Sequence, residues 1–423
     1  MRELPESLQV LRRRDFRLLF TGQSVSVLGD RMVTVALAFA VLQIGGSASE
    51  VGIVLAARIF PSAGCALIGG AVADRASRRS VMVAADLVRV VSQGAMAALL
   101  IGGVAQVWTL ALLAGVGGAA SGFFGPASIG LIPEVVPPEQ LQPANALRSS
   151  GSSAGEILGP LLAGLLVAGA GAGWAIAADA VTFAVSAVCL LMLRLPRRVG
   201  SGSSSFLADL REGWAVFSSR TWVWACVAYF AAANLFWGAW SALGPVVADR
   251  DLGGAAVWGA ILAAVGVGAL VGSVLATQVR PARPLVFVGL SEALFALPLG
   301  FLAATSVVAL LILAALLSGV GLMLGMSVWE STLQRQVPAD SLSRVSSYDW
   351  FGSFVFYPVG LAIWGPVSAA IGIHTSLWIA FGFFIVSILA LLAVPAVRQL
   401  PWSPGVLAEP PRHTAASDAP WPD

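Results

Sequence analysis

The sequence predicts an all-α polytopic membrane protein with twelve transmembrane helices in two pseudo-symmetric six-helix halves. Three observations lead to this fold class. The 423-residue chain is 58% hydrophobic and only 11% charged, whereas soluble domains carry about 25% charged residues. Long apolar runs follow one another and are separated by short links. One of these links recurs about half the length of the chain later.

Each apolar run is long enough to cross a bilayer, which takes about 20 apolar residues in a helix. The runs cover 18–44, 51–73, 81–101, 107–132, 144–169, 174–193, 221–247, 257–279, 285–304, 306–329, 345–371 and 375–396. The division between the ninth and tenth runs is the least distinct, because only residues 304–306 mark a turn there. We expect one helix over each run.

The recurring link divides the chain into halves. A Val-Pro segment that contains an acidic residue follows the fourth run at 136–141, and its counterpart follows the tenth run at 337–342. Two six-helix halves related by repetition are an architecture of secondary transporters. The sequence thus predicts a half over 1–193, a central loop over 194–220, a second half over 221–396 and a disordered tail over 397–423.

Arginine is distributed very unevenly between the two sets of links. All 24 basic residues are arginine, and Arg250 alone lies in the links on one side. Loops rich in basic residues stay in the cytoplasm. We therefore expect both termini and the central loop to be cytoplasmic, in a multi-pass protein of a bacterial cytoplasmic (plasma) membrane whose partner is the lipid bilayer.

Several motifs of soluble enzymes fail in this context. Without lysine the chain cannot form a Walker A loop. The segment 151–155 fits G-x-S-x-G, but that motif needs a preceding strand, an acid and a histidine, and His374 and His413 lie in a link and the tail. The three cysteines lie within apolar runs, and the net charge is only +2. We expect no enzyme, no catalytic residue, no metal site and no nucleic acid partner.

Charged residues inside the runs are the first candidates for function. A charge near the bilayer centre costs about 2.5–3.5 kcal/mol by insertion scales, so it is usually paired and often functional. Asp30 and Glu156 are the leading proton-coupling candidates, with Arg31 and Arg58 as their partners. Desolvation disfavours an ionised carboxylate, whereas a neighbouring arginine favours it. The alternative is that these groups form buried ion pairs that only fix the helix register.

Other charged and aromatic residues allow two interpretations each. Asp86 and Arg89 lie one turn apart, which suits a local ion pair. Asn234, Trp237 and Trp240 share a face of the seventh run. They could line a cavity for a large apolar substrate, or they could be aromatic residues that pack helices together.

Two glycine-containing segments resemble known signatures. The link 70–79 matches the G-x-x-x-D-R-x-G-R-R signature of the major facilitator superfamily, with Ser77 at the usual glycine. The fifth run resembles the antiporter signature of drug exporters, although Ala146 and Ala163 replace two of its glycines. The antiporter-like residues are Gly155, Gly159, Pro160 and Gly164. The candidates for a gating loop are Gly70, Asp74, Arg75, Arg78, Arg79, Asp86 and Arg89.

Within that superfamily, the chain resembles the macrolide-efflux and enterobactin-exporter-like branch of drug:proton antiporters. The segments that carry this resemblance are 16–31, 58–61, 86–89, 132–137, 145–147 and 179–183. The resemblance implies a monomeric, proton-coupled exporter of amphipathic or apolar small molecules that works by alternating access. It needs no cofactor, because the proton gradient supplies the energy. An importer of a small nutrient and a non-transporting membrane receptor or scaffold are the alternatives.

The resemblance also assigns roles to parts of the fold. Asp74 and the arginines of its link would hold the two halves together in one state and release them in the other. The central cavity would lie between the halves near the midplane, lined by spans one, two, four, five, seven, eight, ten and eleven.

Overall fold

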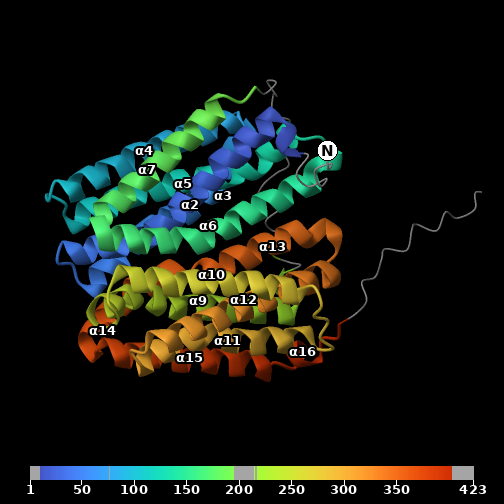
Figure 1. Cartoon of the computed structure of the whole chain (residues 1–423). Coiled ribbons are helices and arrows are strands. Elements are labelled where there is room, and N and C mark those ends of the chain that lie inside the picture. The colour runs from blue at the N-terminus through green and yellow to red at the C-terminus, as the bar shows by residue number, and fades with distance from the viewer. Residues whose placement is uncertain (1–9, 76, 195–213, 215–216, 403–423) are drawn as a thin grey trace, which may run out of the picture.

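The structure is a computed structural model that describes residues 10–75, 77–194, 214 and 217–402 (Figure 1). Within these residues the regular structure is entirely helical, and twelve spans are long and apolar enough to cross a membrane. The predicted fold class is therefore confirmed. Most of the predicted central loop and tail lies outside the described residues.

The two halves lie one above the other in Figure 1, with the helices of each running side by side. The first half contains α2 (Arg14–Gln43), α3 (Ala48–Arg75), α4 (Arg78–Ile101), α5 (Val107–Val135), α6 (Leu141–Ala170) and α7 (Ala172–Leu191). The second half contains α9 (Thr221–Val247), α10 (Ala255–Ala276), α11 (Pro284–Ala304), α12 (Val308–Gln336), α13 (Ala339–Phe354), α14 (Tyr357–Ile371) and α15 (Ile373–Ala393).

The eleventh span differs from the single helix that the sequence predicts. It is divided into α13 and α14, and residues 355–356 separate the two. Pro358 lies in the first turn of α14. It has no N–H to donate to the carbonyl of Phe354, and its ring disfavours a continuous helix at that point.

The beginning of the predicted disordered tail is ordered. A short helix, α16 (Pro395–Gln399), follows α15. The Trp402 backbone N–H donates to the carbonyl of Ala282 at 3.1 Å, and the Arg335 guanidinium lies 4.5 Å from the centre of the Trp402 ring. The prediction of disorder was thus wrong for residues 397–402, because an indole and a cation–π contact anchor them to the second half.

Small residues let neighbouring helices of one half approach closely. A Cβ atom at Gly118 of α5 would collide with the backbone carbonyl of Arg58 on α3. Gly268 of α10 and Gly319 of α12 face backbone atoms of each other's helix in the same way. Such contacts are typical of membrane helices, where close backbone packing drives association. The first of them fixes the position of Arg58.

Contacts between the halves involve the pairs α6 with α10 and α3 with α14. A Cβ atom at Gly164 would lie 2.5 Å from the carbonyl oxygen of Ala255, and one at Gly52 would collide with the carbonyl of Leu361. These glycines lie toward the end of the molecule that has the arginine-poor links, opposite the N-terminus (Figure 1). The halves therefore pack directly against each other at that end.

Candidate functional site

The side chain of Asp30 is the centre of a charged cluster formed by three helices. Arg58 of α3 donates from Nη2 to Oδ1 of Asp30 at 2.9 Å. Arg89 of α4 donates from Nη1 to Oδ2 at 3.5 Å. The Asp30 side chain is 30% exposed, whereas that of Arg89 is only 2% exposed. The structure thus brings Asp30 together with its predicted partner Arg58 and adds Arg89 as a second one.

Arg89 is held rigidly from several directions. It forms an ion pair with Asp86, one turn earlier in α4, so the local pair that the spacing suggested is present. Its guanidinium lies between the rings of Phe124 and Phe183, at 4.3 and 4.1 Å from their centres. Cation–π attraction is strongest for such desolvated cations. Arg89 therefore connects the buried carboxylate of Asp86 to the more exposed carboxylate of Asp30.

A third carboxyl group, Asp179 of α7, also belongs to this region. It is fully buried, and its Oδ1 accepts a hydrogen bond from Thr182 at 3.3 Å. Its Oδ2 has no hydrogen-bond partner among the described residues. A Cβ atom at Gly29 would collide with Asp179, so this carboxyl lies directly beside the backbone that carries Asp30. Sequence reasoning noticed no role for it, although an acidic residue in an apolar run was the available signal.

Glu156 and Arg31 form a separate pair beside the cluster. Arg31 donates from Nη2 to Oε1 of Glu156 at 2.9 Å, which joins α2 to α6. The two side chains are 48% and 40% exposed. Both predicted candidates are therefore present as one solvent-accessible ion pair that is only one residue from Asp30 in α2.

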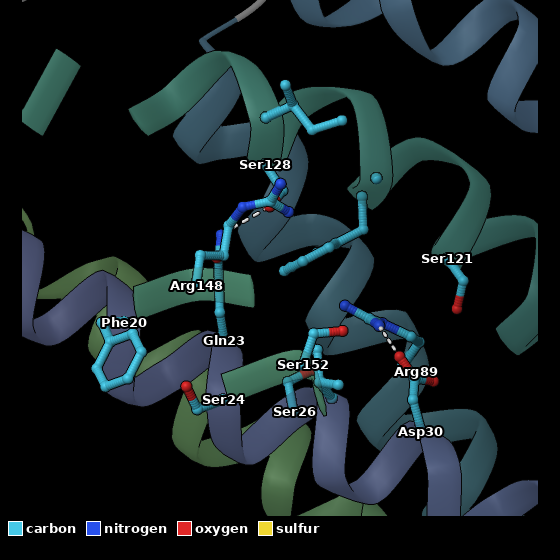
Figure 2. A pocket seen from close by; sticks show the side chains of 14 residues that line it. Phe20, Gln23, Ser24, Ser26, Asp30, Arg89, Ser121, Ser128, Arg148 and Ser152 are labelled. Atoms are coloured by element: carbon cyan, nitrogen blue, oxygen red, sulfur yellow. Dashed lines mark hydrogen bonds and ion pairs between the residues drawn. The ribbon is translucent and has the colours of Figure 1, made fainter. Parts of the chain in front are cut away.

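A cavity of about 280 Å³ extends from the cluster between α2, α4, α5 and α6 (Figure 2). Its polar lining consists of Gln23, Ser24, Ser26, Asp30, Arg89, Ser121, Ser128, Arg148 and Ser152. Gln23 donates to Ser128 at 2.7 Å, which links α2 to α5. Arg89 brings the third span into the lining of this cavity. The resemblance does not count that span among those that line the central cavity. Sequence reasoning also missed Arg148, because the polar residues around it resemble a helix end at the membrane surface.

The described part of the expected gating loop binds within its own half. The Ser77 hydroxyl caps the N-terminus of α4 by accepting from the Ser80 N–H. Arg78 donates to the Gly130 carbonyl and pairs with Glu134 at 3.2 Å. Arg79 donates from Nε to the Leu190 carbonyl at 2.8 Å, at the negative end of the α7 dipole.

The side chains of Asp74 and Arg75 lie outside the described part of the structure, and Gly70 belongs to the same stretch of α3. The proposed latch between the halves therefore stays a prediction.

The antiporter-like residues place α6 between its own half and the other half. A Cβ atom at Gly155 would lie 2.9 Å from Val27, and one at Gly159 would lie 2.5 Å from Arg31, so both glycines face α2. Gly164 instead faces Ala255 of α10. The carbonyl of Pro160 meets α10 as well, where a Cβ atom at Gly259 would collide with it.

The aromatic candidates of α9 lie in a packed cluster. Trp240 is 1% exposed and packs between Trp237 and Trp258, with ring centres 5.6 and 4.7 Å away. Trp237 stacks on Phe295 at 4.1 Å. Asn234 donates to the Phe230 carbonyl of its own helix at 3.0 Å. These contacts favour the helix-packing interpretation for Trp240, whereas a substrate contact of Asn234 or Trp237 stays a prediction.

The second half has its own buried carboxyl group. Glu292 of α11 is 3% exposed and accepts a hydrogen bond from the Tyr229 hydroxyl of α9 at 3.2 Å. The ion pairs formed between described side chains all lie in the first half.

A family model described as "Major Facilitator Superfamily" matches residues 19–355, which is most of the chain. The chain belongs to this superfamily. It is also similar to the multidrug efflux pump Tap of Mycolicibacterium fortuitum, with 27% identity over 88% of this chain and 93% of the pump. Macrolide efflux protein A of Streptococcus pyogenes is 24% identical over 50% of this chain and 53% of its own length, so the chain matches about half of that relative.

Solved transporters share the fold of this superfamily member. A variant of the nucleoside transporter NupG superposes with a TM-score of 0.73 at 13% identity, over 90% of this chain and 99% of that one. A bacterial homologue of the human lysosomal transporter Spinster, described as inward-facing and unoccupied, gives a TM-score of 0.72 at 15% identity, over 95% and 100%. At these identities the similarity concerns the fold alone.

Proposed function

We propose that this transporter is a proton-coupled exporter of amphipathic or apolar small molecules, which acts as a monomer in the cytoplasmic membrane. The observation that carries the proposal is the Asp30 cluster at the edge of the cavity. The relatives named as macrolide and multidrug efflux pumps support the direction of transport. The packing of α6 through its antiporter-like glycines, Gly155, Gly159 and Gly164, supports export further.

The charges of the cluster explain how a proton could be exchanged. Asp30, Asp86 and Asp179 lie near only two cations, Arg58 and Arg89, among the described side chains of the cluster. When all five groups are ionised, one negative charge is in excess, and binding of a single proton removes it. Asp30 is the accessible carboxyl among the three, since Asp86 and Asp179 are fully buried. Protonation of Asp30 would weaken its attraction to both arginines and so alter the contacts of α2 with α3 and α4.

The contacts between the halves suggest which state the structure represents. If the arginine-rich links and both termini are cytoplasmic, the direct contacts between the halves lie at the external end, as expected for an inward-open state. Export would then begin with substrate entry into this inward-open state. Rocking of the halves about the α6–α10 and α3–α14 contacts would expose the same cavity to the other side.

The test is proton-driven transport by an Asp30→Asn variant in inverted membrane vesicles. A panel of dyes and antibiotics, with and without an uncoupler, first identifies a substrate of the unchanged protein. Asn keeps the size of the side chain but cannot exchange a proton, so we expect proton-driven uptake into the vesicles to be abolished. The matched control is Glu139→Gln, which neutralises an exposed carboxylate in the link before α6.

Size-exclusion chromatography must show that both variants are folded. Uncoupler-sensitive transport by Asp30→Asn at the unchanged rate would refute the assignment of Asp30. Uptake of the substrate into right-side-out vesicles, with none into inverted vesicles, would favour the nutrient importer.

A further inference from the structure

Arg148 of α6 lies in the wall of the cavity and lacks the partners that the other arginine there has. Arg89 pairs with both Asp86 and Asp30, whereas Arg148 forms no ion pair with a described residue. The Nε atom of Arg148 is buried and has no hydrogen-bond partner among the residues that the structure describes. A buried donor without an acceptor is costly, by about 1–3 kcal/mol and more for a charged group. That buried nitrogen is out of reach of the cavity, but the terminal nitrogens of Arg148 are not buried and have no hydrogen-bond partner among the described residues, so they can bind an acceptor in the cavity.

The charge of that acceptor follows from the balance inside the cavity. Asp30, the single carboxylate in the lining, is already bound by Arg58 and Arg89. The positive charge of Arg148 is thus not balanced by any described side chain of the lining. A guanidinium group presents parallel N–H donors that match the two oxygens of a carboxylate or another oxyanion. We propose that the cavity binds an oxyanion group of the transported amphipathic molecule, with Arg148 as its anchor.

Hydroxyl groups surround the Arg148 side of the cavity and can complete the coordination. Figure 2 shows Arg148 close to Gln23 and Ser128, with Ser152 and Ser26 between it and the Arg89–Asp30 pair. Ser152 lies one turn after Arg148 in α6, so both point to the same side of that helix. Such hydroxyls can donate to an oxyanion, and none of them carries a competing negative charge.

Helix register gives the distance between the anchor and the proton site. Gly151 packs on Ser24, and Gly159 packs on Arg31, so α6 runs parallel to α2 with a nearly constant offset. Arg148 is therefore about nine residues from Asp30 along the helix axis, or roughly 13 Å at 1.5 Å per residue. Phe20, Phe124 and Ile129 supply apolar surface within the same cavity. A molecule with an oxyanion at Arg148 could thus extend an apolar body toward Asp30.

This inference rests on the proposed function for its identification of the ligand as transported cargo, but its test needs no transport. The unchanged protein is placed in nanodiscs of zwitterionic lipid without a proton gradient. Scintillation proximity then measures the binding of tritiated fusidate, cholate and decanoate, each in competition with its own unlabelled acid and methyl ester. We expect at least one acid to bind specifically and its methyl ester to compete at least tenfold more weakly.

Two substitutions of Arg148 separate charge from geometry. Arg148→Gln should weaken binding of the acid at least tenfold, and Arg148→Lys should lose less because it keeps the charge but not the paired donors. The matched control is Arg283→Gln, an exposed arginine at the start of α11 in the other half. That variant should bind like the unchanged protein.

Three outcomes would overturn the proposal: no specific binding of any of the three acids, equal competition by acid and ester, or unchanged binding by Arg148→Gln. Each of these could occur while the proton-driven export that depends on Asp30 is intact. Conversely, loss of proton coupling would leave equilibrium binding at Arg148 measurable. The two proposals can therefore fail independently.

Discussion

Replacement of Arg89 by methionine should destabilise the protein strongly. Arg89 is 2% exposed and pairs with Asp86, which is fully buried. Methionine has a similar length and can occupy the space between Phe124 and Phe183, but it leaves the Asp86 carboxylate buried without its cation. Removal of one partner of a buried ion pair costs about 3–5 kcal/mol. The lost cation–π attraction contributes about 2 kcal/mol or more for a desolvated guanidinium. We expect the free energy of unfolding to fall by at least about 3 kcal/mol.

The double variant Asp86→Leu/Arg89→Met tests the reason for that loss. The native pair is incompletely satisfied, because Oδ2 of Asp86 and Nε of Arg89 have no hydrogen-bond partner in the part of the chain that the structure describes. Apolar residues of similar volume often replace such a pair at no cost. The double variant should therefore recover most of the stability that Arg89→Met loses, while Asp30 keeps Arg58 as its partner.

The assay is reversible unfolding of purified protein in mixed micelles with increasing fractions of sodium dodecyl sulfate, followed by tryptophan fluorescence. A decrease below about 1 kcal/mol for Arg89→Met would show that Asp86 is not held as a buried carboxylate. A double variant as unstable as the single one would show that packing, rather than the uncompensated charge, causes the loss. Either result would refute the electrostatic account of the cluster.

Two further substitutions test contacts elsewhere in the fold. Gly259→Val should reduce transport severalfold or more, because even a Cβ atom there would collide with the Pro160 carbonyl of the other half. The control Gly94→Val has open space at its Cβ position and should transport normally in the same vesicle assay. Equal transport rates of the two variants would show that transport does not depend on the contact between Gly259 and Pro160. Tyr229→Phe should lower the free energy of unfolding by about 1–3 kcal/mol, since it removes the hydrogen bond to the buried Glu292. A loss below about 0.5 kcal/mol in the detergent unfolding assay would show that this hydrogen bond does not stabilise the protein.

Hydropathy predicted the membrane spans well, because transfer of about twenty apolar residues into a bilayer dominates where the chain must be helical. It could not predict the contacts by which Arg89 also pairs with Asp30. Those depend on how α3 and α4 are rotated about their axes, and glycine contacts such as Gly118 with the backbone of Arg58 fix that rotation. The place of Asp179 in this cluster could not be predicted for the same reason, since its position beside Gly29 is a property of the α2–α7 packing.

The break in the eleventh span was visible in principle. Pro358 lacks an N–H in the interior of an apolar run, and such a residue interrupts or kinks a helix. Sequence reasoning gave more weight to the uninterrupted hydropathy of 345–371. Arg148 was missed because a single arginine near a helix end is usually a surface residue, and its place in the cavity wall becomes evident only when α2 and α5 are placed around it.

The seam between the halves consists of glycines against backbone, as where Gly52 meets Leu361 and Gly164 meets Ala255. No ion pair between described side chains crosses it. Separation of such surfaces breaks only dispersion contacts, which are individually weak and need no rehydration of charges. This end of the molecule can therefore open and reseal without a large electrostatic barrier, and its opening should be nearly independent of ionic strength. The seam is a close backbone contact whose fit depends on the absence of side chains at these glycines.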